Sequence, residues 1–134
     1  VYPHHLLSLA EAHLMAADAL AALQTLERAT KFTDGRLAQQ HRPTLLRLQA
    51  EALRQLRRLD EAETSFREAL QLAAEQRARL YELQAAVGLA RVLRERGRSA
   101  EARALLEPLC ETGFELGVAP LRAARELLEH LAVV

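Results

Sequence analysis

Residues 82–106 read ELQAAVGLARVLRERGRSAEARALL, and this stretch holds the pattern that decides the fold. Two small residues, Ala90 and Ala102, stand twelve positions apart, and the large apolar Leu106 follows. The same pattern recurs at a spacing of 40 residues in the two preceding parts of the chain. The equivalent positions are Ala10, Ala50 and Ala90; Ala22, Ala62 and Ala102; Leu26, Phe66 and Leu106; Leu6, Leu46 and Ala86; and Ala29, Ala69 and Leu109. A fixed period of this length is typical of stacked units that each bury an apolar face on the next unit.

The composition indicates one helix-rich domain without a dominant charge. The chain has 134 residues, of which 50% are hydrophobic and 4% aromatic, and its formal net charge is zero. Such a balance gives no global field that would attract nucleic acid or an anionic membrane. Lys31 is the only lysine among 18 basic residues. That bias is typical of a GC-rich genome, and we expect a bacterial source.

A reducing compartment fits the cysteine content, because Cys110 is the only cysteine and no internal disulfide can form. No apolar run reaches the length of about 20 residues that spans a bilayer, and no signal peptide is recognisable. We therefore expect a cytoplasmic protein with no membrane contact. Because the chain starts at Val1 without a methionine, we also expect it to be a piece of a longer protein.

Helical spacing of apolar residues predicts three helix pairs. The first pair turns near Ala17, and residues 34–43 form the longest connection, with Pro43 opening the next helix. The second pair covers about 43–57 and 60–75, and Asp60 with Glu63 resembles a capping box.

The third pair is expected at about 79–96 and 99–111, and Pro108 should kink or shorten its second helix. A loop bracketed by Gly113 and Gly117 follows. A last helix then begins near Pro120. Its apolar stripe is Leu121, Ala124, Leu128 and Leu131.

The pattern resembles the tetratricopeptide repeat over residues 3–112, most clearly in the third unit and in the turn at 58–62. The residues that carry the resemblance in the third unit are Leu89, Ala90, Leu93, Gly97, Ala102, Leu106 and Leu109. The period of 40 departs from the family's length of about 34 residues, and the family's tryptophan is missing. The resemblance implies an all-α fold, a right-handed α–α superhelix of three helix pairs plus a C-terminal capping helix. The expected repeats are 3–42, 43–82 and 83–117, with the capping helix at 119–132.

Long repeats of this kind resemble those of LuxR-type transcriptional regulators, signal-transduction ATPases and bacterial nucleotide-cyclase fusion proteins. The resemblance implies a non-catalytic scaffold for protein–protein interaction, placed in the regulatory or sensory region of a larger bacterial regulator. Two alternatives stay open. One is a domain that binds a small anionic effector, and the other is a self-association module that dimerises through the exposed ends of the array.

In this family the first helix of each pair lines the concave face, which implies a partner-binding groove. The residues of these three stripes are Leu7, Glu11 and Leu14; Arg47, Glu51 and Arg54; and Val87, Arg91 and Arg94. Such a groove would be apolar at one end and basic at the other, and arginine forks suit carboxylates or phosphates of an acidic partner. Alternatively, Glu51 pairs with Arg47 and Arg54, and the face is only solvated. The clamp of chaperone-binding members is excluded, because the chain has no asparagine and Lys31 falls on a second helix.

Catalytic and metal-binding patterns are missing from the sequence. His4, His5 and His13 lie near the first helix without a carboxylate or cysteine at metal-ligand spacing. We expect His13 as a partly buried core residue and Cys110 as a packed apolar residue. No phosphate loop, nucleophile elbow or zinc-protease motif is recognisable. We therefore expect no catalytic residues, no metal and no cofactor, and the scarcity of aromatic residues makes nucleic acid an unfavourable partner.

Overall fold

Seven helices and no strand form the part of the chain that the structure describes. The computed structural model describes the backbone of residues 3–31, 35–112 and 118–132, and the side chains of 5–31, 39–109 and 122–130. The helices are α1 (Pro3–Met15), α2 (Ala19–Lys31), α3 (Gly35–Gln55), α4 (Leu59–Glu75), α5 (Arg79–Glu95), α6 (Ser99–Thr112) and α7 (Val118–Ala132). The predicted all-α helical repeat fold is confirmed.

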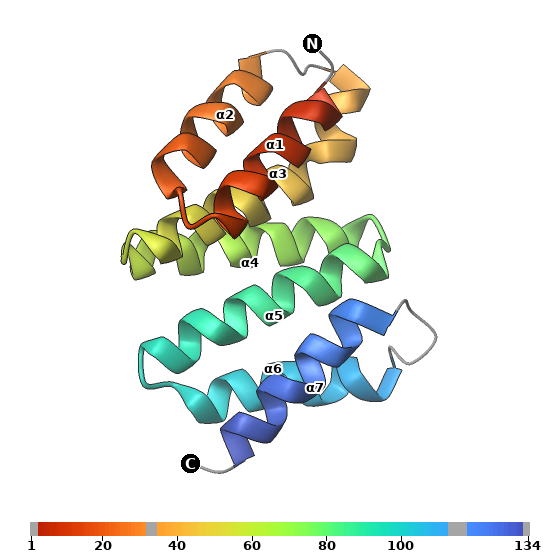
Figure 1. Ribbon diagram of the computed structural model, residues 1–134. Helices are drawn as coiled ribbons and strands as arrows, with labels where there is room; N and C mark the ends of the chain where they lie inside the picture. The colour runs from red at the N-terminus through yellow and green to blue at the C-terminus, as the bar shows by residue number, and fades with distance from the viewer. Residues whose placement is uncertain (1–2, 32–34, 113–117, 133–134) are drawn as a thin grey trace.

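The helices stack in chain order, so that the two termini lie at opposite ends of the molecule (Figure 1). Helices α1 and α2, α3 and α4, and α5 and α6 form three pairs, and α2 and α4 each also contact the pair that follows. The first helices contact one another as well, α1 with α3 and α3 with α5, and α7 packs against α5 and α6. Helix α7 thus takes the position of a further first helix, where a capping helix was predicted.

Repeated alanines let the two helices of each pair approach closely. Ala10, Ala50 and Ala90 on the first helices, and Ala22, Ala62 and Ala102 on the second helices, are all fully buried. The large residues Leu26, Phe66 and Leu106 are equally buried and fill the space beside them. The 40-residue register read from the sequence is therefore the register of the core.

Four turns between helices share one backbone motif. In each turn a residue with positive φ follows the helix: Ala17 (59°), Arg57 (65°), Arg77 (56°) and Gly97 (78°). The amide of the next residue donates to the carbonyl five positions earlier, as from Asp18 to His13 at 2.8 Å. This is a Schellman motif, which satisfies carbonyls that the helix end leaves free. Only Gly97 adopts the left-handed conformation without a Cβ penalty.

The start of α3 differs from the sequence prediction. Helix α3 begins at Gly35 instead of Pro43, and Pro43 lies inside the helix with its ring fully buried. Burial of the apolar ring offsets the hydrogen bond that proline cannot donate. Helix α6 ends at Thr112, one residue beyond the predicted range, so Pro108 does not end it early.

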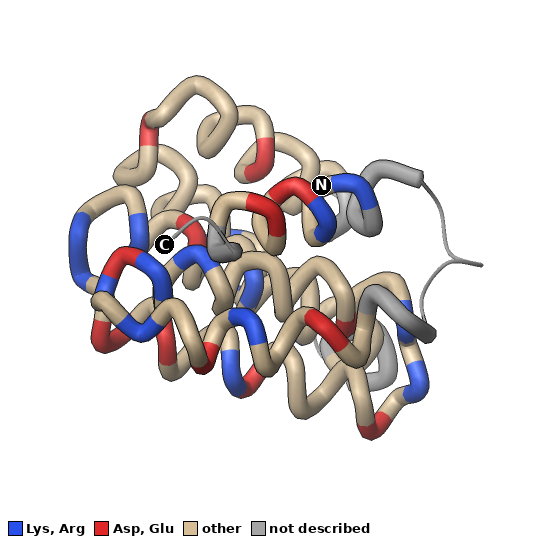
Figure 2. The backbone as a smooth tube through the Cα atoms, turned by 90° about the horizontal axis from the view of Figure 1, so that it is seen from below, with Lys and Arg blue, Asp and Glu red and all other residues tan. Residues whose placement is uncertain are grey.

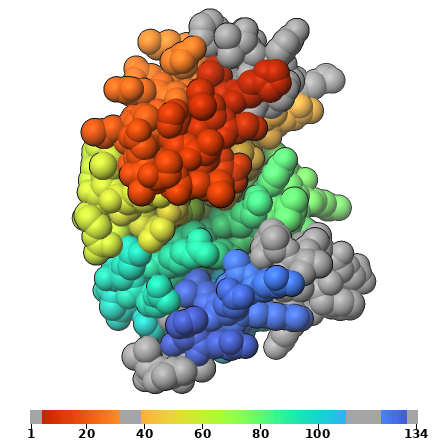
Figure 3. All heavy atoms as spheres, viewed as in Figure 1, coloured from red at the N-terminus to blue at the C-terminus, as the bar shows by residue number. Residues whose placement is uncertain are grey.

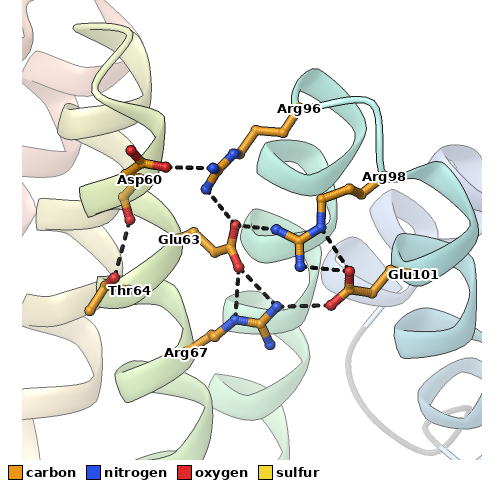
Figure 4. A network of polar contacts seen from close by, with 7 residues as sticks. All are labelled: Asp60, Glu63, Thr64, Arg67, Arg96, Arg98 and Glu101. Carbon is orange, nitrogen blue, oxygen red and sulfur yellow. Dashed lines mark hydrogen bonds and ion pairs between the residues drawn. The ribbon is translucent and has the colours of Figure 1, made fainter.

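The predicted capping box at Asp60 and Glu63 is also wrong. The residue preceding α4 is Arg58, and no side chain caps the helix start. Glu63 instead accepts hydrogen bonds from Arg96 and Arg98, each at 2.8 Å (Figure 4). The Glu63 carboxylate thus binds arginines that follow α5 and does not cap the start of α4.

An ionic network therefore joins the second and third helix pairs. Glu63, with a side chain only 12% exposed, is bound by three arginines from α4 and from the turn between α5 and α6. Arg98 also binds Glu101 at 2.6 Å, and this contact lowers the pKa of the Glu101 carboxyl (Figure 4). The junction between the first and second pairs also contains apolar packing. Leu23 and Leu56 pack there against the N-terminal core cluster.

Several predictions concern side chains or segments outside the described residues. They are the packing of Cys110, the loop between Gly113 and Gly117, and the positions of Leu121 and Leu131. In the described part of α7, Ala124 is fully buried and Leu128 packs against the core, as predicted.

Candidate interaction pocket between the first helices

A pocket of about 250 Å³ opens between α1, α3 and α5, with Phe66 of α4 also in its lining. The surface is hollowed between α1, drawn in red, and α5, drawn in green (Figure 3). Its charged lining residues are Glu11, Arg47, Glu51 and Arg91. We call this space the inter-repeat pocket.

Five of the nine predicted groove residues line the inter-repeat pocket: Glu11, Leu14, Arg47, Glu51 and Arg91. Leu7 and Val87 are instead buried in the core, and Arg94 is exposed outside the pocket. At 3.6 residues per turn, the middle member of each triplet is rotated by about 40° from the first, so the triplets do not face solvent evenly. Glu11, Glu51 and Arg91 are these middle members.

Arg54 belongs to a cluster of charged side chains beside the pocket. Its Nε donates to both Glu51 oxygens at 3.1 Å, and its Nη1 donates to Glu95 of α5 at 2.6 Å. Glu95 also accepts from Arg57 at 3.1 Å. Hydrogen bonding to Glu51 is the largest cause that raises the pKa of Arg54. The predicted pairing of Glu51 with Arg54 is therefore present.

Arg47 differs from Arg54, although both lie on α3. Burial lowers the pKa of the Arg47 guanidinium, against the attraction of Glu11 and Glu51. Neither Arg47 nor Arg91 forms a hydrogen bond or ion pair within the described part of the chain, whereas Glu51 binds Arg54. The predicted pairing with Glu51 is thus a direct contact for Arg54, whereas Glu51 attracts Arg47 without a hydrogen bond or ion pair.

Sequence reasoning missed several lining residues, among them Gln55, Gln84, Phe66 and Gly88. Gln55 donates from Nε2 to the backbone oxygen of Leu14 at 2.9 Å, and its Oε1 is buried without a partner among the described residues. Gly88 admits the ring of Phe66, because a Cβ at position 88 would lie 2.8 Å from Cδ1 and closer still to two other ring atoms. A glycine inside a regular helical pattern was the available signal.

Other chemistries find no support in the described residues. No group of three or more histidine, cysteine, aspartate or glutamate side chains among them is placed to hold a metal ion. His5 is exposed, and His13 is partly buried, as predicted. None of the helices, over the residues described, is long and apolar enough to cross a membrane. Basic and acidic positions are interspersed over the backbone (Figure 2).

Stacked helix pairs with an open pocket between the first helices define an α-helical repeat module. The tetratricopeptide repeat family model matches residues 41–110, which is more than half of the chain, and the chain belongs to this family. No curated protein shows a significant match to the chain. Tetratricopeptide repeats generally mediate protein–protein interaction and are generally non-catalytic.

Proposed function

We propose that the chain is a non-catalytic interaction module that binds an acidic protein or peptide partner in the inter-repeat pocket. The observation that carries this proposal is the pair of arginines, Arg47 and Arg91, that line the pocket without an ion pair in the described part of the chain. Burial makes the charged guanidinium of Arg47 unfavourable, and an incoming anion offsets that cost.

We also propose that the module serves as the regulatory repeat region of a larger cytoplasmic bacterial regulator, either a transcriptional regulator or a signalling ATPase. The long 40-residue period and the arginine-rich composition support this context. Mapping the flanking segments of the parent gene tests it. A neighbouring ATPase, cyclase or helix–turn–helix segment supports the context, and a parent chain without any of these contradicts it.

The pocket itself is tested by capture from a lysate of the source cells with quantitative mass spectrometry. Arg91→Glu should reduce recovery of the bound partners, because it places a negative charge in the pocket lining. Arg94→Glu is the matched control, since Arg94 lies one turn further along α5, is exposed and is outside the lining. Circular dichroism verifies that both variants fold. Equal recovery of the same partners by both variants would contradict binding in the pocket.

Self-association is a second candidate, and the first helix pair favours it. Leu9, Met15 and Leu20 are 43%, 86% and 64% exposed. Exposed apolar groups near one end of an array suit a contact with a second copy. Sedimentation velocity should show concentration-dependent dimers that Met15→Gln with Leu20→Gln disrupts. A monomer at every concentration would exclude this candidate.

A further inference from the structure

We infer that the inter-repeat pocket selects a partner segment in which one carboxylate side chain adjoins a large apolar side chain. This inference rests on the proposed function, because it assumes that the pocket is where the partner binds. It adds the chemical class of the segment, which follows from the charges and the apolar surface of the lining.

The charge of the segment follows from which groups already have partners. Glu51, Arg54, Glu95 and Arg57 form a closed set of two anions and two cations, joined by contacts of 2.5–3.1 Å. The charged residues that remain in the lining are Glu11, Arg47 and Arg91. Their sum is one positive charge, and a single carboxylate neutralises it. A more highly charged anion would leave Glu11 facing an excess of negative charge.

The apolar requirement follows from the exposed apolar part of the lining. Met15 of α1 is 86% exposed and borders the pocket together with Leu14. Leu48 and the ring of Phe66, which reaches α5 because Gly88 has no side chain, also border the pocket and are already almost fully buried. A carboxylate alone would leave Met15 in contact with water. A neighbouring leucine-sized side chain would cover it, and burying such a side chain favours binding by about tenfold or more.

The lining is held in place by contacts between repeats, which reduces the ordering cost of binding. Gln55 ties α3 to α1 through its bond to the Leu14 carbonyl at 2.9 Å. Arg54 ties α3 to α5 through Glu95 at 2.6 Å. Because both ties lie beside the pocket, the relative positions of its three helices are set before a partner arrives.

Titration of the folded chain with blocked tripeptides, followed by NMR at the arginine Nε–H signals, tests the selection. The probe is Leu-Glu-Leu. Its controls are Leu-Gln-Leu, which lacks the charge, and Gly-Glu-Gly, which lacks the apolar side chains. We expect the Leu-Glu-Leu dissociation constant to be about tenfold lower than that of either control. For Leu-Gln-Leu the difference is that of a hydrogen bond to a charged group, and for Gly-Glu-Gly it is that of a buried apolar side chain. The shifts should be largest at Arg47 and Arg91.

Two variants and one further probe make the test decisive. Arg91→Gln should weaken Leu-Glu-Leu binding about tenfold, whereas Arg94→Gln should leave it unchanged. Equal affinity for Leu-Glu-Leu and either control, or no binding of Leu-Glu-Leu, overturns the inference. Inorganic phosphate that shifts the same arginine signals as strongly also overturns it, and would indicate a site for small anions.

The two failures can be told apart. If Arg91→Glu loses the captured partners while the tripeptides are not discriminated, the proposed function stands and the inferred segment chemistry is wrong. If Arg91→Glu and Arg94→Glu recover the same partners, the pocket is not the binding site.

Discussion

Gly88→Ala is the smallest change that tests how the second and third helix pairs meet. Gly88 lies in the middle of α5, where the ring of Phe66 from α4 packs against the helix backbone. An added Cβ would lie less than 3.0 Å from three ring atoms, a spacing that real Cβ atoms do not show. The ring is 1% exposed and belongs to the core cluster, so avoiding the methyl group requires moving it against its core neighbours or toward the inter-repeat pocket that it lines.

Two opposing effects set the magnitude. Overpacking a buried site costs typically 1–3 kcal/mol, and we take about 3 kcal/mol because three ring atoms are affected. Replacing glycine by alanine inside a helix contributes about 1 kcal/mol of stability. The net loss for Gly88→Ala is then about 2 kcal/mol, or a fall in melting temperature of about 8 °C at roughly 4 °C per kcal/mol.

A double-mutant cycle with Phe66→Leu separates the two effects. In the Phe66→Leu background the ring is gone, so Gly88→Ala should stabilise by about 1 kcal/mol, which makes the coupling energy about 3 kcal/mol. Urea unfolding followed by circular dichroism measures all four proteins. Ala104→Gly on the exposed side of α6 calibrates the helix-propensity effect alone. The reasoning is refuted if Gly88→Ala changes stability by the same amount in both backgrounds.

Three further tests concern the core, the turns and the ionic network, and all use the same urea measurement. Ala50→Leu should lower stability by about 1–3 kcal/mol, because residue 50 is fully buried at a close helix approach; unchanged unfolding would mean that the repeat register is wrong. Gly97→Ala should cost about 1 kcal/mol and Ala17→Gly should gain a similar amount, since both positions have positive φ; effects of equal sign would contradict the shared turn geometry. Glu63→Gln should cost about 1 kcal/mol more than Glu61→Gln, which lies in an exposed pair with Arg58, and the difference should shrink at high salt; a salt-independent difference would argue against a charge effect.

The sequence predicts the repeat because packing constrains the alanines most strongly. Ala50 and Ala62 can be neither larger nor polar where two helices meet without a gap, so their period is visible in one sequence. Helix ends are less constrained. Pro43 is compatible with a helix start and with a buried position inside α3, and local sequence does not separate the two.

The pocket was less predictable than the core for a related reason. Arg47 and Arg54 lie on the same face of α3, yet only Arg54 reaches Glu95, which is 41 positions away in the chain. A pattern on one helix cannot reveal a partner on another helix. Because Glu95 binds Arg54, Arg47 is the arginine of α3 that remains for a ligand. The sequence alone does not distinguish Arg47 from Arg54.

Gly88 shows that equivalent positions of the repeat can hold different residues at successive junctions between helix pairs. At the first junction, Leu26 and Leu48 occupy the positions that Phe66 and Gly88 occupy at the second. A larger residue on the second helix is matched by a smaller one on the next first helix, so the space between pairs stays filled. Helix α3 takes part in both junctions. Leu48 belongs to the same core cluster as Leu26, and Ala50 belongs to the same core cluster as Phe66.

The inter-repeat pocket lies where these two junctions meet on α3, and this explains its mixed lining. The Gln55 bond to α1 is neutral, whereas Arg54 forms ion pairs with Glu95 of α5 and with Glu51 of its own helix. Arg47 forms no hydrogen bond or ion pair within the described part of the chain and remains available beside Arg91. The asymmetry between repeats, and not the repeat itself, is thus the source of the binding chemistry that we propose.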